Sequence, residues 1–103
     1  MRDLINNQLK SEVLGTKLNE YQLNLYKKID LILWGKWDPI GVNDCEDARD
    51  EYHSYLPQVF SMKIRNVEKA EIAKYLYEIE TKYMGVVGNL KHCEEIAEEV
   101  VSL

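Results

Sequence analysis

The chain has 103 residues, which is enough for one domain with a single hydrophobic core, and we treat residues 1–103 as that domain. Its 46% of apolar residues and its aromatic side chains (seven Tyr, two Trp and one Phe) argue against intrinsic disorder. The formal net charge of −5 argues against binding to nucleic-acid phosphates or to an anionic membrane.

Residues 1–17 predict an N-terminal helix or an arm. Apolar side chains at roughly helical spacing precede Gly15, which can stop a helix. These side chains are Leu4, Ile5, Leu9, Val13 and Leu14.

Residues 18–34 predict an amphipathic helix capped by Thr16 or Asn19. Its apolar positions advance by three or four residues and therefore share one face, and Asp30 lies off that face. The apolar run at residues 31–34 predicts that the end of this helix is its most buried part. The residues assigned to the buried face are Leu18, Tyr21, Leu25, Ile29, Ile32 and Leu33.

Residues 37–42 predict a structural corner formed by Trp37, Asp38, Pro39 and Gly41. Pro39 disfavours the α conformation at Asp38, so the preceding helix should end near Trp37. Gly41 tolerates a positive φ, which allows the chain to reverse before the next helix. The apolar residues of so short a connection are expected to pack against the core.

A second helix is predicted over residues 44–64, with Asn43 or Asp44 as its N-cap. Acidic side chains crowd its first two turns, where the positive end of the helix dipole favours anions. Pro57 lies inside this pattern. It would either kink the helix or occupy the first turn of a new helix after a loop.

Two more helices are predicted, one from an N-cap at Asn66 to Gly85 and one within residues 86–103. The last helix carries four glutamates on its outer face, whose repulsion must be offset by tertiary packing or by a partner. With no strand pattern and short connections, we expect an all-α fold, a single small antiparallel bundle of about four to five helices. The four glutamates are Glu94, Glu95, Glu98 and Glu99.

Negative charge gathers in two blocks of the chain. Residues 37–62 carry six acidic side chains and one basic side chain, and residues 93–103 carry four acidic side chains and no basic one. Such blocks attract a basic partner with a salt-sensitive association rate. They are equally typical of a solvated acidic face at a helix N-terminus.

The two cysteines, Cys45 and Cys93, show no C-x-x-C spacing and are too few for a disulfide framework. The sequence contains neither a signal-peptide pattern nor an apolar stretch of membrane-spanning length. We therefore expect two free thiols and a cytoplasmic protein.

Four ordered blocks of the sequence resemble a family of small, uncharacterised bacterial proteins. Members commonly read W-D-P-I-G-V, D-E-Y-D-x-Y, I-x-x-Y-L and I-E-x-x-x-M-G. The resemblance spans residues 33–85, within a family core that we take as residues 18–85. It departs at His53, where the family usually has an acid, and after Gly85, where many members stop. The matching residues are Trp37 to Val42, Asp50 to Tyr52 with Tyr55, Ile72, Tyr75, Leu76, Ile79, Glu80, Met84 and Gly85.

Proteins with these blocks also resemble immunity or antitoxin partners that are encoded beside bacterial toxins, including those of contact-dependent growth inhibition systems. The resemblance implies a role in binding another protein. The departure at His53 puts in doubt any role that needs a carboxylate at this position.

Candidate metal ligands are few. Glu46, Asp50 and His53 would share one face of a helix, with Asp38 near the corner, and carboxylates with an imidazole suit Zn or Mn. A metal site also needs ligands from a second element, and the other histidine, His92, falls in a different segment. We predict no metal site and no cofactor.

No catalytic residue is predicted. Asp47 and Asp50 could form an acid/base pair, and either cysteine could meet a histidine, but such pairs arise by chance in a chain of this length. Phosphate-binding loops and zinc-ligand spacings are absent from the sequence. We expect a protein that is not an enzyme.

Protein binding is the interpretation that the composition favours. Carboxylates steer a basic partner and tyrosine anchors it. In an alternative, Asp50 or Glu51 is internal and pairs with Arg49, Arg65 or a lysine, which would fix the helices to the corner. The residues predicted to bind a partner are Glu46, Asp47, Asp50, Glu51, His53 and Tyr55.

Two functions follow as hypotheses. The first is a non-enzymatic immunity or antitoxin-like protein that neutralises a basic toxin, such as a nuclease, by covering it with the acidic face. The second is a structural or adaptor domain that self-associates through a tyrosine-rich face and the helix at residues 89–103, without a toxin partner.

Overall fold

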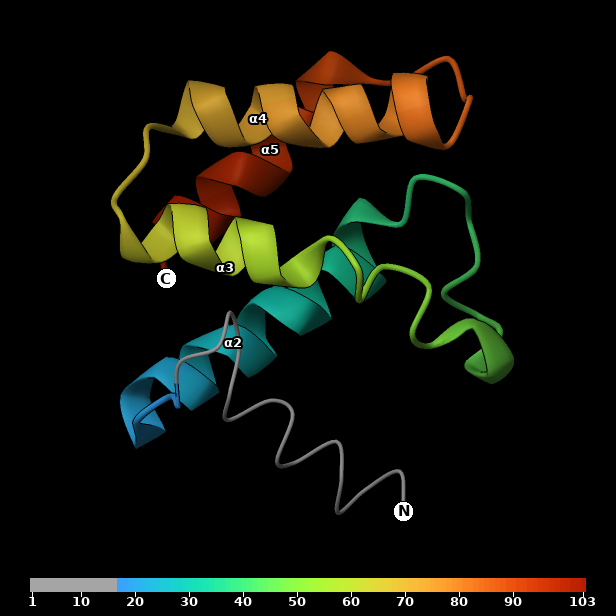
Figure 1. Cartoon of the computed structure of the whole chain (residues 1–103). Helices are drawn as coiled ribbons and strands as arrows, with labels where there is room; N and C mark the ends of the chain where they lie inside the picture. The colour runs from blue at the N-terminus through green and yellow to red at the C-terminus, as the bar shows by residue number, and fades with distance from the viewer. Residues whose placement is uncertain (1–16) are drawn as a thin grey trace.

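The computed structural model describes residues 17–103, and every regular element in this range is a helix (Figure 1). The α-helices pack into a small bundle, which confirms the predicted all-α fold. Except for Lys17, the predicted N-terminal helix or arm lies outside the described residues. The elements are α2 (Glu20–Ile32), the π-helix η2 (Leu33–Trp37), the 3₁₀-helix η3 (Glu46–Ala48), α3 (Leu56–Ile64), α4 (Lys69–Glu78), the π-helix η4 (Ile79–Tyr83) and α5 (Leu90–Val101).

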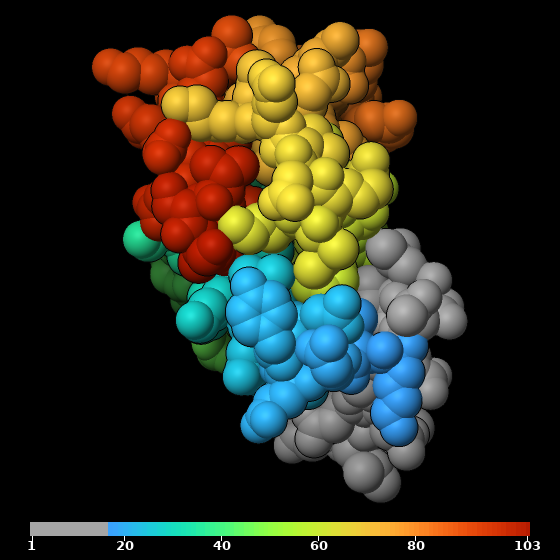
Figure 2. Space-filling view, turned by 90° about the vertical axis from the view of Figure 1, so that its left-hand side faces the viewer, coloured from blue at the N-terminus to red at the C-terminus, as the bar shows by residue number. Residues whose placement is uncertain are grey.

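The helices enclose one hydrophobic core. α5 packs along α4 and also contacts α2 and η2, while α3 packs on α2. In Figure 1, α5 runs behind α3 and α4 and closes that side of the bundle. Figure 2 shows the end of α5 in red, beside the start of α2 and the α3–α4 connection. There Lys63 Nζ donates to the carbonyl oxygens of Val101 and Leu103, both at 2.9 Å.

The buried side chains come from every α-helix of the described range and from both π-helices. None of these helices is long and apolar enough to cross a membrane. The largest fully buried apolar side chains are Trp37, Ile29, Leu33, Leu56, Ile72, Leu76, Ile79 and Ile96.

α2 begins with a capping box at Asn19. Asn19 Oδ1 accepts a hydrogen bond from the backbone N–H of Gln22 at 2.8 Å, and Gln22 Oε1 accepts one from the backbone N–H of Asn19 at 3.1 Å. Both polar side chains satisfy backbone donors that a helix start would otherwise leave unpaired.

The buried face of α2 differs from the predicted one. Tyr21 is 68% exposed, and Leu31, which was expected at the most buried end, is 61% exposed. Asp30 was expected on the outer face and is buried instead, one turn after the buried Tyr26. The face is shifted because α2 is covered from two directions. Tyr26 packs edge-on against Phe60 of α3, with ring centroids 5.3 Å apart, and the segment after the corner covers Asp30.

The chain turns where the corner was predicted. α2 continues into η2, which ends at Trp37. Asp38 adopts the left-handed conformation, with φ 32° and ψ 59°, and Gly41 has φ 66°. The backbone N–H of Asp38 donates to the carbonyl of Leu33, five residues earlier, at 3.1 Å. Such π-helical turns are uncommon and occur frequently at functional sites.

The predicted helix at residues 44–64 is wrong in its first half. Between the corner and Leu56 the chain forms only η3 and a series of turns, and neither Asn43 nor Asp44 caps a helix. α3 begins at Leu56 with Pro57 in its first turn, which is the second of the two positions considered for this proline. The ring of Pro57 would clash with the carbonyl four residues earlier, so a helix that continued through this position would be kinked and would lack one hydrogen bond.

The C-terminal half follows the prediction, with one change. Glu68 rather than Asn66 is the N-cap of α4, because Asn66 has φ 57° and ends the turn after α3. Gly85, with φ 70°, follows η4 as predicted. Asn89 caps α5, where its Oδ1 accepts a hydrogen bond from the backbone N–H of His92 at 3.0 Å.

Lysines from other elements offset the charge on α5. Lys69 Nζ lies 2.9 Å from Glu98 Oε1, and Lys36 Nζ lies 2.7 Å from Glu99 Oε1. These pairs are exposed and stabilise the fold only weakly. They nevertheless reduce the repulsion between the glutamates of α5, which was expected to need an offset from tertiary contacts.

Candidate functional site

A buried carboxylate joins the corner to the C-terminal half. Glu80, in η4, is 2% exposed and accepts three hydrogen bonds. Trp37 Nε1 donates to Oε2 at 2.7 Å, Cys93 Sγ donates to the same oxygen at 3.1 Å, and the backbone N–H of Asn89 donates to Oε1 at 2.8 Å. One side chain thus fixes η2, η4 and the start of α5 to one another.

A second carboxylate holds the corner itself. The Tyr52 hydroxyl donates to Asp38 Oδ1 at 2.6 Å, and the backbone N–H of Val42 donates to the same oxygen at 2.8 Å. Tyr52 is 2% exposed, and its ring centroid lies 5.3 Å from that of Trp37. Burial and the hydrogen bond to Asp38 raise the pKa of Tyr52 far above its ordinary value of 10.0, so the phenol keeps its proton.

These two carboxylate clusters bring the sequence blocks together. Trp37 and Asp38 of the first block meet Tyr52 of the second block and Glu80 of the fourth. Residues that lie far apart in the chain therefore share one network of hydrogen bonds and ring contacts. Residues from three of the four blocks therefore form the scaffold of this corner.

An ion pair fastens the segment after the corner to α2. Both terminal nitrogens of Arg49 donate to Asp30, at 3.1 Å to Oδ1 and 2.8 Å to Oδ2, which is the bidentate geometry that guanidinium groups favour. The guanidinium carbon of Arg49 lies 5.1 Å from the ring centroid of Trp34. His53 Nε2 lies 3.3 Å from Asp30 Oδ1. Burial alone raises the pKa of Asp30, but hydrogen bonds and charge from His53 and Arg49 outweigh it and hold the pKa below 3.8.

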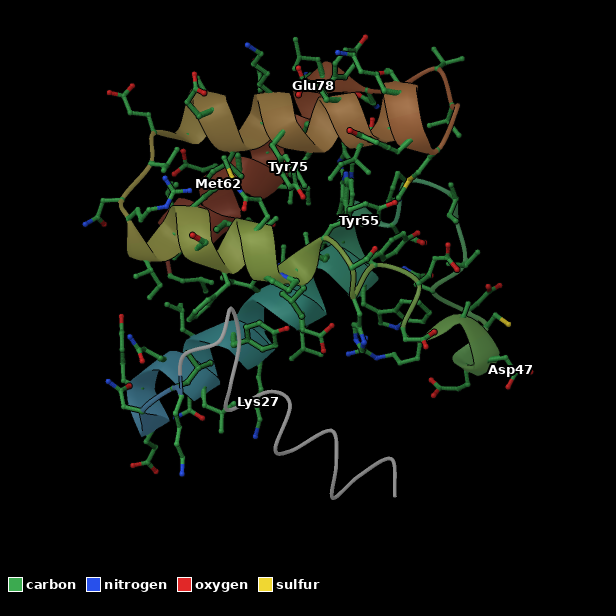
Figure 3. All side chains as sticks on the ribbon, viewed as in Figure 1. Lys27, Asp47, Tyr55, Met62, Tyr75 and Glu78 are labelled. Atoms are coloured by element: carbon green, nitrogen blue, oxygen red, sulfur yellow. The ribbon has the colours of Figure 1, made fainter. Side chains whose placement is uncertain are left out.

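Residues 44–51 form an exposed acidic projection. Figure 3 shows Asp47 at the edge of the molecule, directed away from the bundle. Arg49, the one basic residue of this segment, is engaged by Asp30. No lysine, arginine or histidine in residues 17–103, Arg49 included, forms an ion pair with the carboxylates of the projection. The exposed carboxylates belong to Asp44, Glu46, Asp47, Asp50 and Glu51.

The residues predicted to bind a partner divide into two groups. His53 faces Asp30, with Nε2 3.3 Å from Oδ1. Tyr55, which is labelled in Figure 3, packs edge-on against Trp37 with ring centroids 6.2 Å apart. His53 and Tyr55 are both half-buried, and the side chain of His53 is 35% exposed. The four that lie exposed on the acidic projection are Glu46, Asp47, Asp50 and Glu51.

The alternative in which Asp50 or Glu51 is internal is wrong, because both are exposed. Among residues 17–103 the buried carboxylates are Asp30 and Glu80, and neither was predicted to be buried. A signal was present, since each lies four residues after a large apolar residue, Tyr26 for Asp30 and Leu76 for Glu80. One turn of helix places such residues on the same face.

The metal arrangement considered from the sequence does not form. Glu46, Asp50 and His53 do not share a helix face, since only η3 within their segment is helical. Among residues 17–103, no three or more potential ligands come together as a metal site would require.

An open groove lies beside the corner. It is lined by residues 35–39 on one side and residues 86–89 on the other, and its volume is about 580 Å³. Glu80 and Asp38 both contribute to its lining. Ligand pockets measure about 300–1,000 Å³, so the groove is large enough to receive a group from outside. A smaller cavity of about 210 Å³ lies at the α3–α4 connection.

The two thiols have different environments. Cys45 is exposed on the chain between the corner and η3, whereas Cys93 is fully buried in α5, and both are free. Burial, the hydrogen bond to Glu80 and the charge of that carboxylate together raise the pKa of Cys93 to about 12. Since the thiolate is the reactive form, Cys93 is held in an unreactive state.

A thiol reagent tests this difference. In the native protein at about pH 8, we expect Ellman's reagent to modify one thiol, that of Cys45, and to modify both after unfolding in guanidinium. The Cys45→Ser variant should show no reaction until it is unfolded. Rapid modification of native Cys45→Ser would contradict the structural role assigned to Cys93.

Comparison of the chain with protein-family models, with curated proteins and with solved structures finds no match.

Proposed function

We propose that this protein is a non-enzymatic immunity or antitoxin-like protein that binds and neutralises a basic bacterial toxin, such as a nuclease, through the acidic projection. The observation that carries the proposal is the exposure of five carboxylates within residues 44–51, while Arg49 is turned toward Asp30. The projection therefore presents negative charge to solvent without a basic residue of its own to screen it.

The attachment of the projection to the bundle supports a binding role. Tyr52 fastens its C-terminal side to Asp38, and Arg49 fastens its middle to Asp30. A surface held in place in this way loses little conformational freedom on binding, which favours affinity. Clustered carboxylates also raise the rate at which a basic partner arrives.

The resemblance to toxin-associated immunity proteins supports the same function. The residues of its blocks that meet at the corner are buried or half-buried, whereas most of the exposed acids lie outside the blocks. We infer a shared scaffold that presents a partner-specific surface. The proposal places the protein in the cytoplasm, where two free thiols persist.

Charge reversal tests the proposal. The double variant Glu46→Lys, Asp47→Lys is expected to lower the association rate constant for the basic toxin domain encoded beside it by at least about tenfold. The salt dependence of that rate should also become weaker, and the melting temperature should stay unchanged because both residues are exposed. Surface plasmon resonance at several salt concentrations measures both effects.

The double variant Glu94→Lys, Glu95→Lys is the matched control, since it makes the same change in net charge at exposed positions of α5. Equal effects of the two double variants would mean that net charge alone guides binding. A stable dimer in sedimentation, together with no detectable binding of the wild-type protein to the toxin, would favour the self-associating adaptor instead.

A further inference from the structure

The groove beside the corner contains a buried negative charge without a cation. Glu80 accepts its hydrogen bonds from an indole N–H, a backbone N–H and a thiol, all of which are neutral. Within residues 17–103, no lysine, arginine or histidine forms an ion pair with it. Burial removes water that would solvate this carboxylate, so a cation that keeps part of its own hydration in the open groove would gain from the unbalanced charge.

The other groups of the groove do not balance that charge. Lys36 contributes to the lining, but its ammonium is engaged by Glu99 of α5 at 2.7 Å. His92 places its Nε2 2.8 Å from the carbonyl oxygen of Lys36. Asp38 adds a second carboxylate, which accepts hydrogen bonds only from the Tyr52 phenol and from backbone N–H groups. The lining is therefore anionic.

The lining also offers apolar surface for a long side chain. Trp37, Pro39 and Val87 all contribute to it, and Val87 is 92% exposed. Lysine and arginine combine an apolar stem with a cationic head, and arginine also stacks on aromatic rings. The hydrogen bonds of Asp38 and Glu80 hold both sides of the groove in place, so it is formed before a ligand arrives.

We propose that this groove receives one lysine or arginine side chain of the basic partner, with its stem against the apolar lining and its head toward Asp38 and Glu80. The inference rests on the proposed function, since it concerns the same partner. Asn43 contributes to the groove and directly precedes Asp44, so the lining of the groove is joined by the chain to the start of the acidic projection. The projection guides the partner, and the groove seats one of its residues.

A small probe tests the groove without the toxin. N-acetyl-arginine amide is titrated into the full chain and followed by proton–nitrogen NMR. We expect saturable shifts of the Trp37 indole N–H and of the Asn89 amide, because both donate to Glu80. N-acetyl-citrulline amide has nearly the same shape without the charge, and it should bind at least about tenfold more weakly.

Variants locate the bound probe. Glu80→Gln keeps the size of the side chain and removes its charge. It should weaken binding of the arginine probe about tenfold. Because Glu80 is buried and its replacement can impair folding, the exposed Val87 supplies a second pair of variants. Val87→Asp should strengthen the binding and Val87→Lys should weaken it, with equal melting temperatures.

Several results would overturn the groove assignment. They are equal binding of the two probes, shifts confined to residues 44–51, or equal affinity of the two Val87 variants for the arginine probe. Each of them leaves the charge-reversal result with the toxin untouched. Conversely, if charge reversal at the projection left toxin binding unchanged, the proposed function would be contradicted. Binding of the arginine probe to the groove could still be observed in that case.

Discussion

Replacing Trp37 by alanine is expected to lower the free energy of unfolding by about 3–5 kcal/mol. The side chain is 1% exposed, its ring contacts those of Tyr52 and Tyr55, and its N–H donates to Glu80. The substitution opens a cavity and leaves a buried carboxylate short of a donor at once. Small domains are stable by about 5–15 kcal/mol, so this loss is a large fraction of the total stability. Urea unfolding followed by circular dichroism measures the loss.

Two further variants separate the contribution of the Trp37 hydrogen bond from that of its buried ring. Trp37→Phe keeps an aromatic ring in the corner and removes the hydrogen bond to Glu80, which should cost about 1.5–3 kcal/mol. Trp34→Ala makes the same chemical change three residues earlier, at a half-buried position, and should cost clearly less than Trp37→Ala. If Trp34→Ala proved as damaging as Trp37→Ala, the corner would not be the centre of the fold.

Asp30→Asn is expected to cost about 3 kcal/mol, at the low end of the range for breaking a buried ion pair. The low end applies because the Arg49 side chain is 32% exposed and can partly return to water. Hydrogen exchange should quicken in residues 49–55 more than in α4, since this segment loses its attachment to α2. Glu98→Gln breaks an exposed pair with Lys69 and serves as the control, with a much smaller expected effect.

The same ion pair predicts a loss of stability in acid. Burial opposes ionisation of Asp30, but hydrogen bonds and charge from His53 and Arg49 prevail, so its pKa in the folded protein is lowered. Its contribution is fully present above the ordinary pKa of 3.8 and is lost as the pH falls through the lower folded-state pKa. The stability difference between the wild type and Asp30→Asn should therefore narrow below about pH 4. A difference that stayed constant down to about pH 2 would contradict this ionic role.

Helix ends and turns were largely predictable, because they depend on the backbone preferences of single residues. Gly41 and Gly85 adopt the positive φ expected of them, and Asn89 caps the helix that it precedes. Pro57 limited the choice to a kink or a new helix, and the new helix formed. Residues 44–55 failed as a helix, because Arg49 and Tyr52 bind Asp30 and Asp38 on other segments, and such distant contacts leave no local pattern.

The sequence by itself determined an all-α fold, the place of the corner and the concentration of acids at residues 44–51, since periodicity, proline and charge act locally. Only the tertiary structure decided which carboxylates are buried. Trp37 and Glu80 are 43 residues apart, and Arg49 binds Asp30 although several acids lie closer to it in the chain. Burial of charge depends on which donors the completed fold brings within reach, so the exposed surface follows from packing.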